Sequence, residues 1–331
     1  MLAAGATAVV VDVRDGDQVL QGAAGVADIG SERPAEADDP VRIASITKAM
    51  TATVVMQLVE EGALTLDDTV DALLPGILPS PAPVTVRQLL DHTSGIPEYI
   101  PVVIPDAQAA IAHKETAHTP EELIDAALTL PWTADPGTEF HYANTNYVLL
   151  GLIIESITDQ SVADTLQERI FEPAGMLDTV YPDGSEISDE ALRGYLTVDG
   201  VRTDLTEYNE SFWSSGAAVV STVGDVATFF RELHAGRLVS PDSVTQMQQI
   251  GVEGYGFGIL AGGDACGAVP PELVYGQRGN GFGYNSMSFG DPSGERMMTL
   301  AWTGGTFDPA TDPITPAASD LLITGLAATC S

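Results

Sequence analysis

Hydrophobic residues recur at two different spacings in the first sixty residues of the chain. Residues 8–13 form a short run rich in β-branched side chains, which is typical of a strand. Over residues 45–61 the apolar positions recur every three or four residues, as on one face of a helix. They are Ile46, Met50, Val54, Val55, Leu58 and Val59. Gly62 follows, where a helix often ends in a left-handed glycine, so the pattern predicts a strand and then a helix.

The middle of the chain favours helices. A stretch rich in proline and glycine at residues 74–81 marks a change in composition. Beyond it, Thr119 and Pro120 precede a helical pattern at residues 121–128. Residues 147–158 are almost continuously apolar, which predicts a buried helix.

Strand patterns return from about residue 216. Residues 217–222 lead into a helical pattern at residues 225–233, residues 255–260 favour a strand, and residues 317–329 favour a helix. Strands near both chain ends with helices between them predict an α/β (α+β) fold. We expect residues 1–78 and 205–331 to form one discontinuous α/β domain, and residues 79–204 to form a mostly helical domain.

Composition narrows the range of partners. The chain has 331 residues and is 44% hydrophobic, enough for a large core. Its formal net charge is −34 although only 18% of its residues are charged, so the imbalance comes from scarce cations more than from surplus acids. Such a surface repels nucleic acid and anionic membranes, and we expect neither as a partner. No run of 18 apolar residues predicts a transmembrane helix.

Other motifs do not indicate a metal or a cofactor, and we expect neither. The histidines lack the spacing of a zinc site; they are His92, His113, His118, His141 and His234. The glycines at 279, 281 and 283 have the spacing of a dinucleotide loop, but no amphipathic helix follows them, so a strand edge is favoured.

Ser45 and Lys48 are the first candidates for chemistry. Lys48 is one of only two lysines, and it follows Ser45 by three residues at the start of a predicted helix. Residues i and i+3 share a helix face, so the amine can approach the hydroxyl. If burial lowers the pKa of Lys48, the amine can take the hydroxyl proton and activate the nucleophile. The alternative is that Ser45 is only a helix N-cap and Lys48 a solvated residue of the first turn.

The chain resembles the serine β-lactamase and penicillin-binding superfamily over nearly its whole length. The Ser45-x-x-Lys48 tetrad continues into residues 57–68 and residues 85–96, which are typical of that superfamily, and Tyr142-x-Asn144 matches its second signature. The resemblance is greatest to secreted D-alanyl-D-alanine carboxypeptidases, which cleave the stem peptides of peptidoglycan. It implies a β-lactamase-like antiparallel sheet flanked by helices, an inserted helical domain, and an active site in the cleft between them.

The resemblance also implies a role for each matching side chain. Ser45 is the acylated nucleophile and Lys48 its proton partner. Tyr142 passes the proton to the leaving nitrogen, and Asn144 hydrogen-bonds the substrate amide. Phe212 is expected among the substrate-binding residues.

The third signature of the superfamily is altered in this chain. The usual Lys-Thr-Gly or His-Thr-Gly is replaced by Gln277-Arg278-Gly279. Gly279 lets the strand approach the substrate. The resemblance further implies that the backbone N–H groups of Ser45 and Asn280 form the oxyanion hole. The changed residues put the usual hydrogen-bonding roles of positions 277 and 278 in question.

Arg278 is the candidate for recognition of the substrate's end. In the carboxypeptidases, strand hydroxyls and an Arg on the neighbouring strand hold the terminal carboxylate, whereas residues 259–263 contain no Arg. Side chains two apart on a strand share a face, so Arg278 and Asn280 take the places of those hydroxyls. A guanidinium can bind a carboxylate with two hydrogen bonds. We therefore predict that Arg278 binds a substrate carboxylate; the alternative is that it extends to solvent at the rim of the cleft.

Cys266 and Cys330 are the only cysteines. The resemblance implies that they form a disulfide holding the last residues to the sheet, and a secreted or extracytoplasmic location. Two buried free thiols are the alternative. Residues 1–13 have no cationic segment and do not match a signal peptide, so any leader is absent from this chain.

Together these observations predict a serine hydrolase that forms an acyl-enzyme at Ser45. The expected enzyme is a D-alanyl-D-alanine carboxypeptidase or related D-amino-acid peptidase, acting as a monomer on a peptide or β-lactam. An esterase or β-lactamase on the same fold is one alternative, and a non-catalytic penicillin-binding-like protein is another. The altered residues at 277 and 278 favour the non-catalytic alternative, whereas the four preserved positions argue against it.

Overall fold

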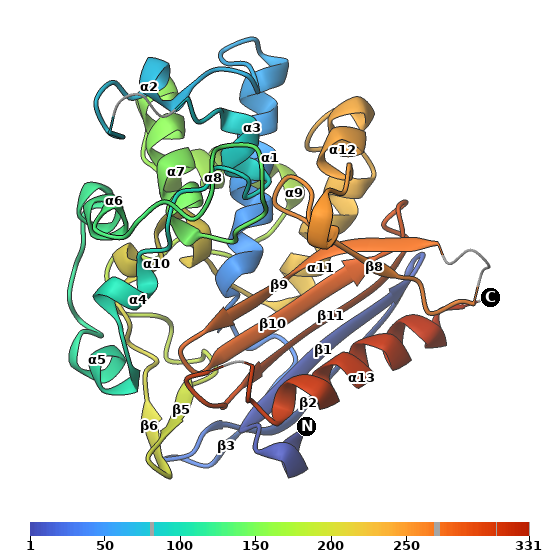
Figure 1. The fold of residues 1–331 in the computed structure, drawn as a ribbon. Coiled ribbons are helices and arrows are strands. Elements are labelled where there is room, and N and C mark those ends of the chain that lie inside the picture. The colour runs from blue at the N-terminus through green and yellow to red at the C-terminus, as the bar shows by residue number, and fades with distance from the viewer. Residues whose placement is uncertain (80–82, 268–271, 309, 331) are drawn as a thin grey trace.

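The computed structural model describes residues 1–79, 83–267, 272–308 and 310–330, and it is built around a seven-stranded antiparallel sheet. The strand order is β3-β2-β1-β11-β10-β9-β8. In chain order the strands are β1 (Ala8–Asp15), β2 (Gln18–Asp28), β3 (Arg33–Pro34), β8 (Leu260–Gly263), β9 (Leu273–Gly281), β10 (Tyr284–Gly290) and β11 (Arg296–Thr303). Both chain ends therefore supply the sheet and meet where β1 pairs with β11 (Figure 1). The predicted antiparallel sheet flanked by helices is confirmed.

Helices cover both faces of the sheet. Helix α13 (Ile314–Ala328) crosses one face, and α11 (Val223–His234) lies on the opposite face (Figure 1). Between β1–β3 and β8–β11 the chain also forms β4 (Val41–Arg42), α1 (Thr47–Glu60), α2 (Val70–Leu73), α3 (Val86–Leu90), α4 (Ile100–Val103), α5 (Ala107–Ala112), α6 (Pro120–Leu128), α7 (Asn144–Thr158), α8 (Val162–Leu166), α9 (Glu172–Ala174), β5 (Tyr195–Val198), β6 (Val201–Asp204), α10 (Glu210–Ala217), β7 (Val220–Ser221) and α12 (Pro241–Met247). Within the described residues, none of these helices has the length and apolarity that crossing a membrane requires.

The alternation of side chains along β11 explains the two layers. Met298, Leu300 and Trp302 point to the face that packs against α13. Met297 and Ala301 point to the opposite face, into the larger core shared with the helices from the middle of the chain. The division of the chain into two domains at residues 79 and 205 stays a prediction, and residues 80–82 at the first boundary lie outside the described part.

The helix predicted at residues 45–61 forms with one difference. Ser45 lies in a short 3₁₀ turn (Ala44–Ile46), and α1 begins at Thr47. The alternative of Ser45 as an N-cap is wrong, because no side chain caps this helix. At the other end Gly62 has φ 72°, and the N–H groups of Gly62 and Ala63 donate to the carbonyls of Val59 and Leu58. The predicted glycine stop is therefore confirmed as a Schellman motif.

Two other predicted helices form as expected. Helix α6 begins at Pro120, where the Thr119 side chain accepts from the N–H of Glu122 and the Glu122 side chain accepts from the N–H of Thr119. Helix α7 begins at Asn144, three residues before the predicted start. This earlier start places Asn144 in the first turn of a buried helix.

The strand predicted at residues 255–260 is wrong, because only Leu260 of that segment belongs to a strand. Gly258 has φ 72°, and a Cβ there would lie 2.6 Å from the Cβ of Ala52 and 2.9 Å from the carbonyl oxygen of Lys48. The segment therefore turns tightly against α1 instead of extending.

The predicted disulfide between Cys266 and Cys330 is confirmed. The two Cα atoms lie 5.4 Å apart, and the bond joins the segment after β8 to the residue after Thr329 at the end of α13. Apolar residues of α13, including Ile314, Ala318 and Leu326, pack against the sheet. The bond therefore holds one end of a helix whose apolar side completes the smaller core.

Removing this disulfide should destabilise the fold. The bond closes a loop with a sequence separation of 64, for which chain entropy gives on the order of 4 kcal/mol. We expect Cys266→Ser, Cys330→Ser and the double variant to lose the same free energy of unfolding in urea titrations, because either change removes the whole bond. Losses that add up in the double variant, or free thiols in the unfolded unreduced protein, would contradict this prediction.

Candidate active site

Ser45 lies where the turn before α1 packs directly against β9. A Cβ on Gly279 of β9 would lie 2.2 Å from the carbonyl oxygen of Ile43 and 3.1 Å from the Cβ of Ala44. Gly279 is thus required by the backbone of this turn, whereas the sequence suggested that it makes room for substrate. Ala44 has φ 48°, an uncommon conformation for a residue with a Cβ. The chain therefore holds Ser45 on a tight turn at the free edge of the sheet.

The amine of Lys48 is completely buried beneath Ser45. Its Nζ donates to Ser45 Oγ at 3.0 Å, to Asn144 Oδ1 at 2.6 Å and to the carbonyl oxygen of Gly216 at 3.0 Å. The side chain has no exposed surface, so the alternative of a solvated Lys48 is wrong. A Cβ at Gly216 would lie 3.3 Å from Nζ, so glycine there leaves room for the amine.

Glu98 fixes the orientation of Asn144. Its Oε2 accepts from the backbone N–H of Asn144 at 2.7 Å and from Asn144 Nδ2 at 2.9 Å. The Asn144 amide oxygen must therefore face Lys48. The predicted role of Asn144 toward the substrate remains a prediction, because this oxygen already accepts from the amine.

Tyr142 is held with its hydroxyl 3.0 Å from Ser45 Oγ, to which it donates. The ring of His92 lies against the ring of Tyr142, with centroids 4.3 Å apart. His92 Nδ1 accepts from the N–H of Ala143 and from the amide of Asn146, so the ring is neutral and its proton is on Nε2. Burial and the charge of Lys48 keep the pKa of His92 well below its usual value. His92 therefore positions Tyr142 rather than exchanging protons.

Burial shifts the pKa values of Lys48 and Tyr142 in opposite directions. Burial lowers the pKa of Lys48 to about 7, against the opposing effect of the Glu98 carboxylate. Removal from water raises the pKa of Tyr142 well above 10, although its ring is partly exposed and the positive charge of Arg278 acts in the other direction. At neutral pH a large fraction of Lys48 is therefore a free amine, whereas Tyr142 is a neutral phenol.

The free edge of β9 faces Ser45. The backbone N–H of Arg278 donates to Gln277 Oε1 at 3.0 Å, so it points away from β10. In antiparallel sheets alternate N–H groups share a direction, so the N–H of Asn280 also points to this edge. An N–H there has the direction that an oxyanion hole requires.

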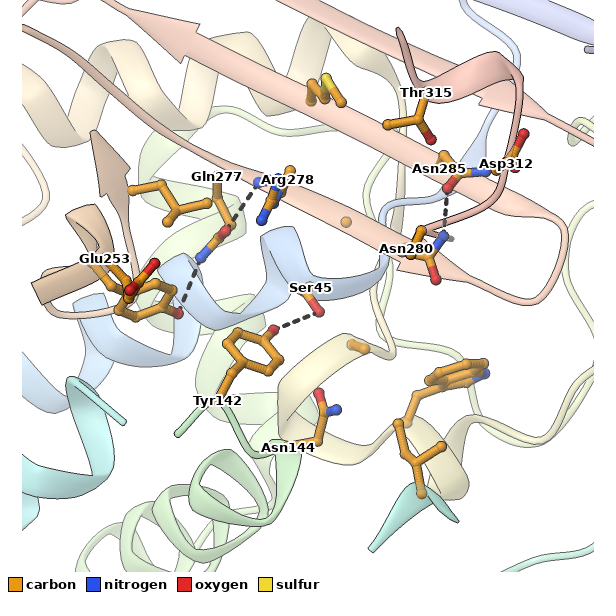
Figure 2. Close-up of a pocket in the computed structure, with 18 of the residues that line it drawn as sticks. Ser45, Tyr142, Asn144, Glu253, Gln277, Arg278, Asn280, Asn285, Asp312 and Thr315 are labelled. Carbon is orange, nitrogen blue, oxygen red and sulfur yellow. Dashed lines mark hydrogen bonds between the residues drawn. The ribbon is translucent and has the colours of Figure 1, made fainter. Parts of the chain in front are cut away.

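Gln277 and Arg278 occupy opposite faces of β9. Gln277 is buried, and its Nε2 donates to the carbonyl oxygen of Gly258 at 2.8 Å and to Tyr255 Oη at 3.2 Å. Protein groups thus occupy the Gln277 amide. Arg278 is exposed and lines the pocket near Ser45 (Figure 2), and it belongs to none of the ion pairs among the described residues.

The pocket around Ser45 has a volume of about 690 Å³. Asn280 is exposed in it, and its Nδ2 donates to Asn285 Oδ1 at 2.6 Å (Figure 2). Among the described residues, no side chain donates to the Oδ1 of Asn280. Phe212 is outside the pocket wall, because its ring is buried among other aromatic rings, whereas the neighbouring Trp213 lines the pocket. The structure therefore brings together every predicted site residue except Phe212.

Sequence reasoning missed three contributors to this site. Glu98 comes two residues after the recognised 85–96 segment, and that position was its only signal. Gly216 contributes a backbone carbonyl within a run of small residues. Trp213 and Phe212 are neighbouring aromatic residues of α10, and the helix directs Trp213 rather than Phe212 to the pocket. Backbone acceptors and the direction of a helical residue depend on tertiary packing, so the sequence pattern carried little information about them.

A serine hydroxyl that is hydrogen-bonded to a buried lysine and to a tyrosine, at the edge of an antiparallel sheet, is the arrangement expected of a serine hydrolase. A family model described as beta-lactamase matches residues 3–318, and the chain belongs to this family. The D-aminopeptidase of Brucella anthropi is 32% identical over 231 residues, covering 69% of this chain and 42% of that protein. Penicillin-binding protein 4 of Amycolatopsis lactamdurans is 31% identical over 240 residues, covering 69% of this chain and 59% of that protein. The matches thus span about half of these relatives' length.

A solved structure extends the similarity to the whole fold. The D-amino acid amidase of Ochrobactrum anthropi SV3, complexed with L-phenylalanine amide, superposes with a TM-score of 0.85 at 26% identity. The superposition covers 98% of this chain and 94% of that chain.

The pKa of Lys48 predicts the pH dependence of acylation. A protonated amine cannot accept the Ser45 proton, so kcat/KM for an activated ester should fall as pH drops through about 7 and reach a plateau above it. Because the Glu98 carboxylate raises the pKa of Lys48, Glu98→Gln should move this acid limb to lower pH.

The control for this prediction is Glu121→Gln, which removes an exposed carboxylate in the first turn of α6 and should leave the pH profile unchanged. A rate that declines with rising pH near 7, or a limb that moves equally in both variants, would mean that Lys48 is not the base.

Proposed function

We propose that this protein is a serine peptidase that releases a carboxylate-bearing D-residue from the end of a peptide through an acyl-enzyme at Ser45. The hydrogen bonds from Lys48 and Tyr142 to Ser45 Oγ, both 3.0 Å, are the observation that carries the proposal. They give the hydroxyl a base and an acid at the same oxygen.

Acylation begins with neutral Lys48. The carbonyl of Gly216 and the amide oxygen of Asn144 accept the two N–H bonds of the neutral amine, so its lone pair faces Ser45 Oγ and the hydrogen bond between Lys48 and Ser45 reverses: the hydroxyl now donates to Nζ. The Ser45 proton moves to Lys48 Nζ as Oγ bonds to the substrate carbonyl carbon, and the carbonyl electron pair moves to oxygen. The N–H groups of Ser45 and Asn280 receive that oxyanion.

Collapse of the tetrahedral intermediate releases the leaving group. The carbonyl re-forms as the C–N bond breaks, and the leaving nitrogen takes the proton of the Tyr142 hydroxyl, which lies beside Oγ. The proton on Lys48 then restores the phenol. For hydrolysis, Lys48 takes a proton from an attacking water and returns it to Ser45 Oγ as the ester bond breaks.

Arg278 supports a substrate that ends in a carboxylate. It is an exposed cation in the pocket and lies beside Tyr142, and no carboxylate of the described residues forms an ion pair with it although the chain's net charge is −34. A guanidinium binds a carboxylate with two charge-assisted hydrogen bonds. The disulfide supports action in an oxidising, extracytoplasmic compartment, where peptidoglycan peptides are found.

A second candidate is a D-amino-acid amidase or aminopeptidase, as two of the similar proteins are named. The Oδ1 of Asn280 favours this candidate, because an acceptor suits a substrate ammonium or amide N–H. Acyl-D-alanyl-D-alanine and D-phenylalanine amide distinguish the two: release of D-alanine from the first supports the carboxypeptidase, and exclusive release of ammonia from the second supports the amidase.

Ser45 should be the single acylated residue. After incubation with penicillin or a fluorophosphonate, intact-protein mass spectrometry should show one adduct. Ser45→Ala should abolish this adduct and lower kcat by a factor of roughly a thousand or more. Ser286→Ala is the matched control, because it removes another buried hydroxyl beside the same turn and should retain the adduct. An adduct in Ser45→Ala, or none with any acyl donor, would refute the proposal.

Arg278→Ala should weaken kcat/KM for peptides ending in a free carboxylate by about 2 kcal/mol, because a charge-assisted hydrogen-bond pair is lost. The matching peptide amides should be hydrolysed as well by this variant as by the wild type. Arg202→Ala, which removes an exposed arginine of β6, should change neither. Equal losses of kcat/KM on both substrate types would mean that Arg278 supports the stability of the site and does not bind the carboxylate. No loss on either type would mean that Arg278 extends to solvent at the rim of the cleft.

A further inference from the structure

The pocket does not end at the edge of β9 but continues over the sheet face that packs against α13. Leu260, Met287 and Trp302 line the pocket and also belong to the apolar cluster on that face. Thr315 and Pro316, at the start of α13, line it from the other side. These five residues define what we call the outer-face groove.

Strand register connects this groove to the catalytic side. Arg278 pairs with Met287, and Asn280 pairs with Asn285, which pairs in turn with Trp302. Paired residues of antiparallel strands point to the same face. Arg278 and Asn280 are therefore the exposed ends of two rows of side chains that run into the groove. Figure 2 shows them on the strand that passes between Ser45 and Thr315.

The leaving group lies on the Arg278 side of Ser45. Tyr142 protonates the leaving nitrogen in the proposed mechanism, and Tyr142 and Arg278 lie on the same side of Ser45 in Figure 2, opposite Asn280. In an α-amino acid the side chain and the carboxylate share one carbon. A leaving residue whose carboxylate binds Arg278 therefore has its side chain close to the row of side chains that Arg278 and Met287 form on the outer face.

The pocket is larger than a methyl side chain requires, and its outer part has an apolar component. The whole pocket measures about 690 Å³, which is within the range that encloses an entire small ligand. Its outer part presents a leucine, a methionine and an indole beside the side chains of Asn285 and Asp312. The apolar portion of this surface gains by contact with an apolar ligand group.

We propose that the outer-face groove binds the side chain of the leaving residue, so that the enzyme prefers peptides ending in a D-amino acid with a large apolar side chain and a free carboxylate. This inference rests on the proposed acyl-enzyme function and specifies its substrate. It makes Met287 and Thr315 specificity-determining residues without placing either in the catalytic machinery.

The test compares kcat/KM for acyl-D-alanyl peptides that end in D-alanine, D-leucine or D-phenylalanine. We expect kcat/KM for the D-leucine and D-phenylalanine peptides to exceed that for the D-alanine peptide by on the order of tenfold. The reason is that the extra carbon atoms of these side chains move out of water and into the groove. Thr315→Trp should fill the groove and abolish this preference. Ile323→Trp, at an exposed position of α13 outside the pocket, is the matched control and should keep the preference.

Two further measurements separate this inference from the proposed function. Calorimetric titration with free D-phenylalanine and D-alanine reports on the groove without catalysis, and binding of D-phenylalanine should be tighter and lost in Thr315→Trp. Penicillin labelling of Ser45 reports on the acyl-enzyme in each variant. If labelling is normal but the three peptides react equally, or Thr315→Trp keeps the preference, the groove proposal is overturned and the proposed function stands. If Ser45 is never labelled, the proposed function fails and the groove proposal falls with it.

Discussion

The burial of the Lys48 amine is the constraint on which the site depends. An amine without contact with water is stable only where acceptors replace that water, and here each acceptor comes from a different element: the turn before α1, α7 and α10. The same burial lowers the pKa of Lys48 to about 7. The packing that brings these elements together therefore also favours the neutral amine, which is the form that the proposed function requires.

One loop between α3 and α4 supports both partners of this centre. His92, near its start, packs against the ring of Tyr142, and Glu98, near its end, fixes the amide of Asn144. His92 is neutral and acts by positioning. Glu98 positions Asn144, and its charge also raises the pKa of Lys48. The orientation of the Tyr142 ring and of the Asn144 amide is thus set by a single segment.

The altered third signature moves a cation from one face of β9 to the other. A lysine at position 277 would point inward, where Gln277 now binds the carbonyl of Gly258 and the hydroxyl of Tyr255. Arg278, one residue later, points to the outer face because successive strand residues alternate. Gly279 still allows the turn of Ser45 to pack on the strand, and the N–H of Asn280 keeps its direction. The backbone part of the site is preserved, while the cation of this strand lies on the outer face beside the groove.

The sequence by itself determined several secondary-structure elements and the contacts between side chains that are close along the chain. Helical spacing predicted α1 and its glycine stop, and it predicted the helix that begins at the capping pair of Thr119 and Glu122. The spacing of Ser45 and Lys48 placed a hydroxyl beside an amine. These features depend on neighbours within one or two helical turns. Motif resemblance added Tyr142 and the cysteine pair. Only the tertiary structure decided the rest. It buried Lys48, brought the carbonyl of Gly216 to the amine, turned residues 255–259 away from a strand, and placed Phe212 behind the pocket wall. Burial, backbone acceptors and the direction of a side chain depend on which distant segments pack together, and local sequence patterns do not encode those contacts.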